Sequence, residues 1–182
     1  INNKLHDLST NIDYDCNVEI ITKKSPEALD IIRHDAAHVM AEAVQVIFPK
    51  TKVAIGPTIK DGFYYDFDSD VSFSPDDFKK IEKKMSQIIK RNNKFVREIW
   101  DRKKALKFFE DKNEIYKVEI IKSLNEDEDL TIYKQGEWVD LCRGPHSIST
   151  GFINYSFKIM KIAGAYWRGN SKNKMLQRIY AT

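Results

Sequence analysis

The sequence of 182 residues has only two cysteines, Cys16 and Cys142, and no long run of apolar residues. Two cysteines cannot build a disulfide framework, so we expect a reducing compartment and a cytoplasmic location. No stretch approaches the roughly 18 consecutive apolar residues of a membrane-spanning helix, and no apolar signal-peptide core stands near Ile1. Repeats with a period of about 20–50 residues are also absent, which argues against a solenoid. Because the chain begins with Ile1 rather than Met, we expect a piece of a longer protein.

Neither sign of charge is in large excess. The 30 lysines and arginines against 27 aspartates and glutamates leave a net charge of +3. This mild basic bias is compatible with contact to nucleic acid but is far from that of a dedicated duplex-binding protein. With 42% hydrophobic and 31% charged residues, the composition is that of a folded globular protein, not a disordered one.

The apolar spacing predicts a mixture of helices and short strands. Residues 28–48 carry an i, i+3, i+4 apolar stripe; Ser25 is the expected N-cap, and Pro49 ends the helix. The opposite face is also apolar, so this helix should be buried on more than one side. Asp61-Gly62 predicts a hairpin turn. Further helices are expected near 74–91, 101–110 and 114–122, and strands near 18–22, 95–100, 130–134, 137–141, 157–163 and 176–181. Without a regular βαβ rhythm, this order favours an α+β fold with a mostly antiparallel sheet packed with helices.

Three of the four histidines fall into two short motifs. His34 and His38 are spaced i, i+4 on the first helix, which puts both imidazoles on one face. Cys142 and His146 follow a predicted strand, and the Gly-Pro between them makes a sharp turn that can direct both side chains into one cleft. Either pair alone is more often incidental than functional, but together they form a known metal-ligand inventory. A phosphate-binding loop, a dinucleotide fingerprint and a Gly-x-Ser-x-Gly elbow are all missing.

These motifs and several others match one family. Five segments resemble the N-terminal editing region of bacterial threonyl-tRNA synthetases: His34-Asp-Ala-Ala-His38, Ala54-Ile-Gly-Pro-Thr-Ile-Lys-Asp-Gly-Phe-Tyr-Tyr-Asp66, Tyr116-Lys-Val118, Asp140-Leu-Cys-Arg-Gly-Pro-His146 and Ala163-Gly-Ala-Tyr-Trp-Arg-Gly169. The resemblance implies an editing domain over residues 25–182 with the fold of threonyl- and alanyl-tRNA synthetase editing domains. Residues 1–24 would be the tail of a small ubiquitin-like domain and a linker. The aminoacylation core and the anticodon-binding domain of the family are missing from the sequence.

The function that the resemblance implies is proofreading by ester hydrolysis. The domain would cleave serine from mischarged seryl-tRNA(Thr) at the 3′-terminal adenosine and would spare threonyl-tRNA. His34 and Lys117 would be the catalytic pair, and the substrate would be bound by His38, Tyr133, Asp140, Cys142 and His146. Each of these has a simpler interpretation: Lys117 could be a solvated helix residue, Asp140 could lie on the solvent face of a strand, and Tyr133 could be ordinary sheet packing.

Two questions stay open at this stage. His34, His38, Cys142 and His146 could hold zinc, as the related alanyl-tRNA synthetase domains do, but we expect a metal-free site without a cofactor. A closed shell of one Cys and three His suits a structural zinc better than a catalytic one. The alternatives to a deacylase acting within a synthetase are a non-catalytic zinc-stabilised module that docks the tRNA acceptor end, or a free-standing trans-editing deacylase. The expected partner is the serine-bearing acceptor end of tRNA(Thr), with the fragment monomeric and the full-length enzyme dimeric through its catalytic core.

Overall fold

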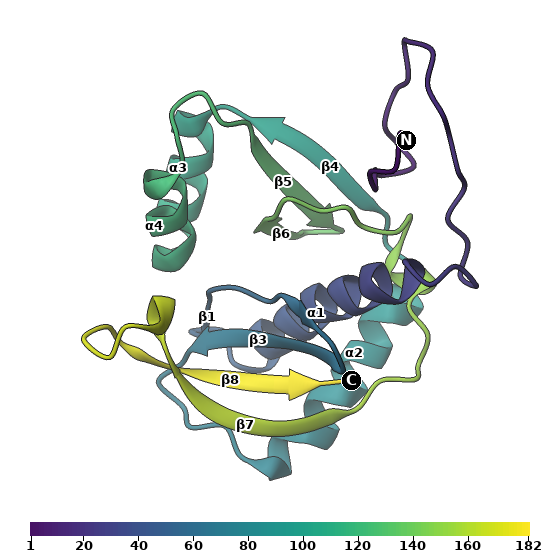
Figure 1. The fold of residues 1–182 in the computed structure, drawn as a ribbon. Helices are drawn as coiled ribbons and strands as arrows, with labels where there is room; N and C mark the ends of the chain where they lie inside the picture. Colours follow the sequence, from purple (N-terminus) through teal and green to yellow (C-terminus); the bar gives the residue numbers. More distant parts are fainter.

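The computed structural model describes all residues from Ile1 to Thr182 and contains four α-helices and two antiparallel sheets (Figure 1). The helices are α1 (Ala28–Ile47), α2 (Phe78–Arg91), α3 (Arg102–Asp111) and α4 (Ile115–Ser123). The strands are β1 (Lys52–Val53), β2 (Thr58–Ile59), β3 (Gly62–Asp68), β4 (Phe95–Trp100), β5 (Leu130–Gln135), β6 (Trp138–Leu141), β7 (Ile159–Tyr166) and β8 (Met175–Ala181). The predicted α+β class is confirmed.

The larger sheet has the order β1-β3-β8-β7, with β2 forming the predicted hairpin with β3. Period-two alternation along β3 sends Phe63, Tyr65 and Phe67 inward, each 1% exposed or less. Helices α1 and α2 pack against this sheet, and the buried side chains of all three elements form the main core (Figure 1). The helix α2 is preceded by one 3-10 turn at Pro75–Asp77, where Ser74 and Asp77 form a capping box.

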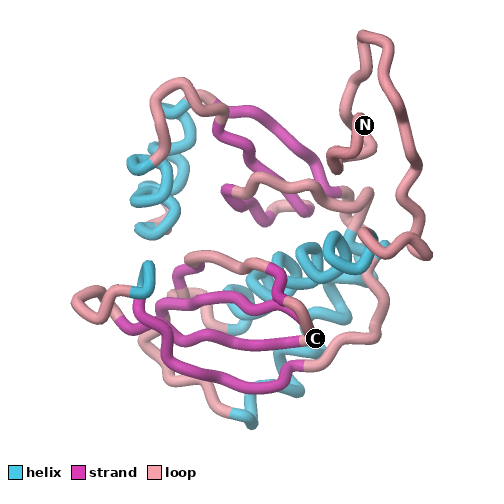
Figure 2. Tube along the Cα trace, in the orientation of Figure 1, coloured by secondary structure: helices cyan, strands magenta, loops and turns pink.

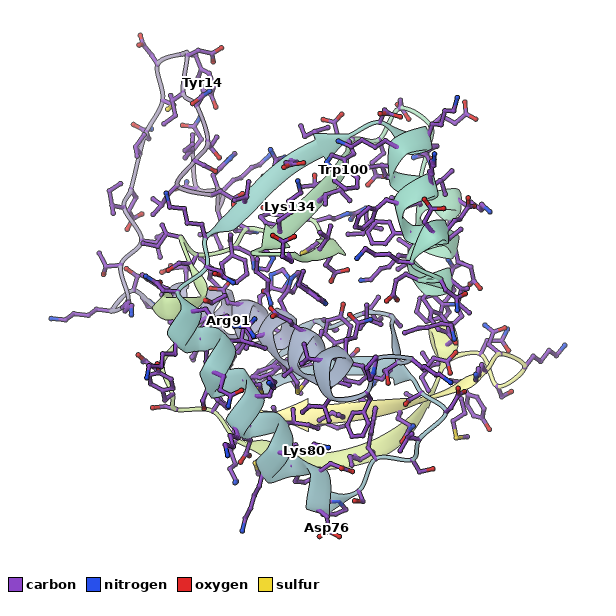
Figure 3. The ribbon with its side chains drawn as sticks, turned by 180° about the vertical axis from the view of Figure 1, so that it is seen from behind. Tyr14, Asp76, Lys80, Arg91, Trp100 and Lys134 are labelled. Carbon is purple, nitrogen blue, oxygen red and sulfur yellow. The ribbon has the colours of Figure 1, made fainter.

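A second, smaller layer is built from β4, β5 and β6 in that order, together with α3 and α4. Trp100 at the end of β4 points toward α3 (Figure 3) and packs edge-on against Phe108, with ring centroids 5.1 Å apart. Asp101 caps α3: its side chain accepts a hydrogen bond from the backbone N–H of Lys104 at 2.9 Å.

Helix α1 runs between the two layers (Figure 1), and its central part, residues 35–44, is buried without interruption. The prediction that this helix is covered on more than one side is therefore confirmed. The arrangement matters for function, because any side chain that leaves α1 toward β6 enters the space between the layers.

Two predictions about the N-terminal part are wrong. Residues 18–22 form no strand, and the first 24 residues are loop and turns throughout (Figure 2). The alternation there finds no neighbouring strand, and a β-strand forms only through hydrogen bonds to a partner strand. Ser25 is not the N-cap of α1: Glu27 holds that position, while the Ser25 hydroxyl accepts a hydrogen bond from the Thr22 N–H. None of the helices is both long and apolar enough to cross a membrane.

Candidate editing site

The two histidines of α1 project from one face of the helix toward β6. One turn of helix separates them, and their ring centroids lie 5.0 Å apart at an interplanar angle of 85°. His38 is buried at 3% exposure, whereas His34 is only half-buried. The first histidine therefore reaches solvent, and the second belongs to the interior.

The second motif reaches the same place from the end of β6. Gly144 adopts a φ of +69° and is followed by a cis peptide bond to Pro145, which turns the chain sharply. The Cys142 sulfur consequently lies 3.2 Å from His34 Nε2 and 3.4 Å from His146 Nε2. The four ligand-type atoms of His34, His38, Cys142 and His146 all lie within 4.8 Å of one another. The structure thus unites two motifs that are separated by more than a hundred residues.

A buried ion pair adjoins the histidines. Lys117 on α4 and Asp140 on β6 are both nearly inaccessible, and the Lys117 ammonium lies 2.5 Å from Asp140 Oδ1. Neither interpretation as a solvent-facing residue holds, because the two side chains are buried against each other. His38 Nε2 lies 3.7 Å from Asp140 Oδ2 and connects the ion pair to the histidine cluster.

Tyr65 on β3 is a site residue that the sequence analysis missed. Its hydroxyl donates to Asp140 Oδ2 at 2.7 Å and accepts from the Lys117 ammonium at 3.1 Å. Gly56 makes room for its ring, since a Cβ there would lie 2.1 Å from a ring carbon. A tyrosine on the inward face of a strand needs a polar partner for its hydroxyl, and that requirement was the available signal.

Asp35 is the second missed residue. It lies between the two histidines in sequence, is fully buried, and accepts a hydrogen bond from His146 Nδ1 at 2.8 Å. It also accepts from the backbone N–H of Ser147. This carboxylate fixes the ring of His146 so that Nε2 faces Cys142. A buried acid beside two histidines could have been suspected from its position on the helix.

Burial and neighbouring charges perturb the site's proton affinities. Burial, together with nearby His146 and His34, holds the pKa of His38 well below its ordinary value, so this imidazole is neutral at pH 7. Burial opposes charging of the Cys142 thiol, but hydrogen bonds with His146 and His34 lower its pKa to about 6. Burial likewise opposes protonation of His146, but hydrogen bonds with Asp35 and Cys142 raise its pKa to about 9. The thiolate and the imidazolium thus stabilise each other.

A cleft of about 610 Å³ opens onto these groups, a size within the usual range for small-molecule sites. Five of the seven predicted site residues line it: His34, His38, Lys117, Asp140 and Cys142. Tyr133 and His146 do not line it. Both are buried behind the turn at Gly144, where a Cβ on that glycine would lie 2.0 Å from the Tyr133 hydroxyl oxygen. These two residues therefore shape the wall of the cleft without facing its interior.

Other charged and aromatic residues lie outside the cleft or at its rim. Arg143 is at the rim, with its side chain 82% exposed and 2.6 Å from Glu128. Trp167 is a buried core residue, and its indole N–H donates to Glu119. The basic residues of α2 that include Lys80 and Arg91 lie on the far side of the molecule from the smaller sheet's helices (Figure 3), and Arg91 pairs with Glu42 at 2.9 Å.

The donor set is chemically suited to zinc. In a tetrahedral zinc site, nitrogen and sulfur ligands lie about 2.0–2.3 Å from the metal and so about 3.3–3.7 Å from one another. The two sulfur–nitrogen distances at Cys142 fall close to this range, and the largest separation of 4.8 Å exceeds it. His34, His38, Cys142 and His146 could hold the ion with a small movement of one side chain, but all four positions of the shell would then be protein ligands.

Comparisons with known proteins point to one group of tRNA synthetase domains. Residues 130–180 match the family described as the threonyl and alanyl tRNA synthetase second additional domain. The whole chain is 59% identical to a threonine–tRNA ligase of Wolbachia pipientis and 55% identical to that of Gluconobacter oxydans, of which it spans 29% and 28%. It is also 56% identical to the threonine–tRNA ligase of Rickettsia bellii, again over 182 residues.

The family match spans β5, β6 and the turn after β6, and the longer matches also span α1. The chain spans less than a third of the length of the curated relatives it matches. The family match and the identity over all 182 residues support the assignment of this chain as a threonyl-tRNA synthetase editing domain.

Proposed function

We propose that this domain hydrolyses the ester of mischarged seryl-tRNA(Thr) and spares threonyl-tRNA. The observation that carries the proposal is the convergence of His34, Lys117 and Asp140 on one cleft, from three elements distant in sequence. An aminoacyl ester is already activated, so a positioned water and a stabilised oxyanion are sufficient for its cleavage. The cleft provides a half-exposed imidazole and an ammonium group, which are suited to these two tasks.

In the proposed reaction, His34 orients a water molecule and accepts its proton as the oxygen attacks the ester carbonyl carbon. The tetrahedral oxyanion then collapses, the bond between that carbon and the ribose oxygen breaks, and the ribose oxygen takes a proton from the His34 imidazolium. The products are serine and uncharged tRNA. His34 fits this role better than His38, because only His34 combines access to solvent with a place on the cleft wall.

Lys117 would stabilise the negative charge that develops in the transition state or hold the ribose hydroxyl. Its ammonium is fixed between Asp140 and Tyr65, so little reorganisation is needed when the charge appears. Asp140 Oδ1 faces no polar group other than this ammonium and can accept a hydrogen bond from the serine hydroxyl or ammonium. Tyr65 holds the other oxygen of the carboxylate in place.

Selectivity against threonine follows from size in this proposal. One methyl group gives only about 1–3 kcal/mol of discrimination by binding alone, and a synthetase that separates threonine from serine therefore benefits from a second, hydrolytic site. The buried walls contributed by Tyr65 and His38 leave little freedom to accommodate an added methyl group. The expected partner is the acceptor end of tRNA(Thr), and the expected location is the cytoplasm. We expect these 182 residues to be monomeric on their own and the full-length enzyme to be dimeric through its catalytic core.

We further propose that the site works without metal. Lys117 and Asp140 already provide a cation and an anion beside the histidines, and a zinc ion held by four protein ligands would have no open position for water. A zinc-stabilised module that only docks tRNA is the competing function, since the same four donors would serve it. Excess chelator should leave the thermal unfolding midpoint and the deacylation rate unchanged. Stoichiometric zinc in the purified protein, with activity lost on chelation and restored by zinc, would favour the metal site.

The decisive experiment compares deacylation of seryl-tRNA and threonyl-tRNA by this chain. The parent should hydrolyse the seryl ester and leave the threonyl ester intact. The double variant His34→Ala with Lys117→Ala should lose at least about 100-fold in rate, the size expected when a general base or an oxyanion donor is removed. Lys122→Ala, an exposed lysine of the same helix, is the control and should keep the parent rate. Parent-like hydrolysis by the double variant would refute the proposal.

A further inference from the structure

The N-terminal segment, residues 1–24, contains no regular structure and yet reaches the site. It is tied into a loop by hydrogen bonds between Asn2 and Asn17, and it lies beside β4 (Figure 1). Leu5 lines the same cleft as His34. Two residues later, the side chain of Asp7 turns inward and is only 13% exposed, although most of its neighbours in the segment face solvent.

Both oxygens of the Asp7 carboxylate are engaged by buried groups of the site. Oδ2 accepts a hydrogen bond from the Tyr133 hydroxyl at 2.7 Å, and Oδ1 accepts one from the backbone N–H of His146 at 3.1 Å. Arg97 on β4 adds a longer contact, with its Nε 3.9 Å from Oδ2. One carboxylate thus connects the strand β5 to the turn that follows β6.

The two groups that Asp7 holds are linked in turn to Cys142. The Tyr133 hydroxyl lies directly behind Gly144, whose backbone N–H donates to the Cys142 sulfur at 3.3 Å. His146 also approaches that sulfur through its Nε2. A shift of Tyr133 or of the His146 backbone would therefore move the wall of the cleft on which Cys142 stands.

We propose that Asp7 is a positioning residue of the editing site, which makes the N-terminal segment a functional part of it. The carboxylate holds Tyr133 and the Cys142–His146 turn in the arrangement that the reaction requires. The effect on catalysis rests on the proposed deacylation, whereas the positioning itself is a structural claim that can be measured separately. A mere surface contact would have left the carboxylate hydrated instead of placing both oxygens on buried donors.

The test uses Asp7→Asn, Tyr133→Phe and their combination in the 182-residue chain. Asparagine keeps the shape of the side chain but offers one acceptor atom for two donors. We expect either single variant to lower kcat for seryl-tRNA by up to about 100-fold with KM unchanged, because a displacement of roughly 1 Å can cost that much. The double variant should lose no more than the worse single one, because both changes break the same contact. Asp13→Asn, an exposed acid of the same segment, is the matched control and should behave like the parent.

A second measurement does not need activity. In Asp7→Ala the amide of His146 loses its acceptor, so its hydrogen exchange, followed by NMR, should be faster than in the parent and in Asp13→Ala. If the His146 amide exchanges faster in Asp7→Ala than in the parent, but the parent hydrolyses no seryl-tRNA, the proposed function fails and the positioning claim stands. Exchange unchanged in Asp7→Ala, a loss confined to KM, or losses that multiply in the double variant would each overturn the role of Asp7.

Discussion

Replacing Lys117 with methionine removes one partner of a buried ion pair in the site. The side chains of Lys117 and Asp140 are 3% and 2% exposed, so the remaining carboxylate would be largely buried without its counter-ion. Breaking a buried pair in this way costs about 3–5 kcal/mol. For a chain of this length, such a loss lowers the thermal midpoint by roughly 6–20 °C. The change in size is small, because methionine fills much of the space of the lysine stem.

The assay is urea unfolding of the parent and three variants, followed by far-UV circular dichroism. Lys117→Met should shift the midpoint strongly to lower urea. Lys117→Met combined with Asp140→Asn should recover at least about 2 kcal/mol, because no uncompensated charge is then buried. Lys122→Met is the control: it lies on the same helix, is 61% exposed, and is 3.5 Å from Glu110, a kind of pair worth about 0–1 kcal/mol.

Two results would refute the reasoning. If Lys117→Met unfolds at the same urea concentration as Lys122→Met, the ammonium is not desolvated and the ion pair behaves like a surface pair. If the double variant is no more stable than Lys117→Met alone, the cost arises from lost packing and not from the stranded carboxylate. In either case the electrostatic preorganisation proposed for Lys117 would lose its basis.

Two further predictions concern backbone geometry and pH. Gly144→Ala should lower the unfolding free energy, measured in thermal melts, by more than Gly169→Ala does. Both glycines have a positive φ, +69° and +67°, which costs a residue with a Cβ about 1–2 kcal/mol, but only at Gly144 would the Cβ also meet the Tyr133 hydroxyl. Equal losses in the two variants would contradict this. Burial raises the pKa of Asp68, but hydrogen bonds, above all from Lys174, hold this pKa below the ordinary value of 3.8. The ionised carboxylate therefore stabilises the folded state above pH 3.8, and this stabilisation is lost as the pH falls through the lowered pKa. The stability difference between the parent and Asp68→Asn should therefore shrink in urea titrations from about pH 5 downward, and a constant difference would refute the shift.

Much of the local structure could be predicted from the sequence. The apolar stripe of α1, the Asp-Gly turn before β3, and the cap at Asp101 each depend on interactions between residues close in the chain, which propensity and spacing describe well. The segment 18–22 shows the limit of such patterns. Its alternation is typical of a strand, but a strand needs a partner, and the presence of a partner is a property of the whole fold.

The candidate site divides in the same way. His34 with His38, and Cys142 with His146, were recognisable as pairs because helical spacing and a Gly-Pro turn set their local geometry. The rest of the site depends on α1 lying between the two layers. This placement brings the two pairs together and lets Lys117 be buried against Asp140. It also allows the hydrogen bonding of the site to be completed by Tyr65, Asp35 and Asp7.

The sequence by itself determined the chemical groups and their local pairing. Only the tertiary structure decided which of them lose water and which face the cleft, because desolvation and contact depend on atoms contributed by distant segments.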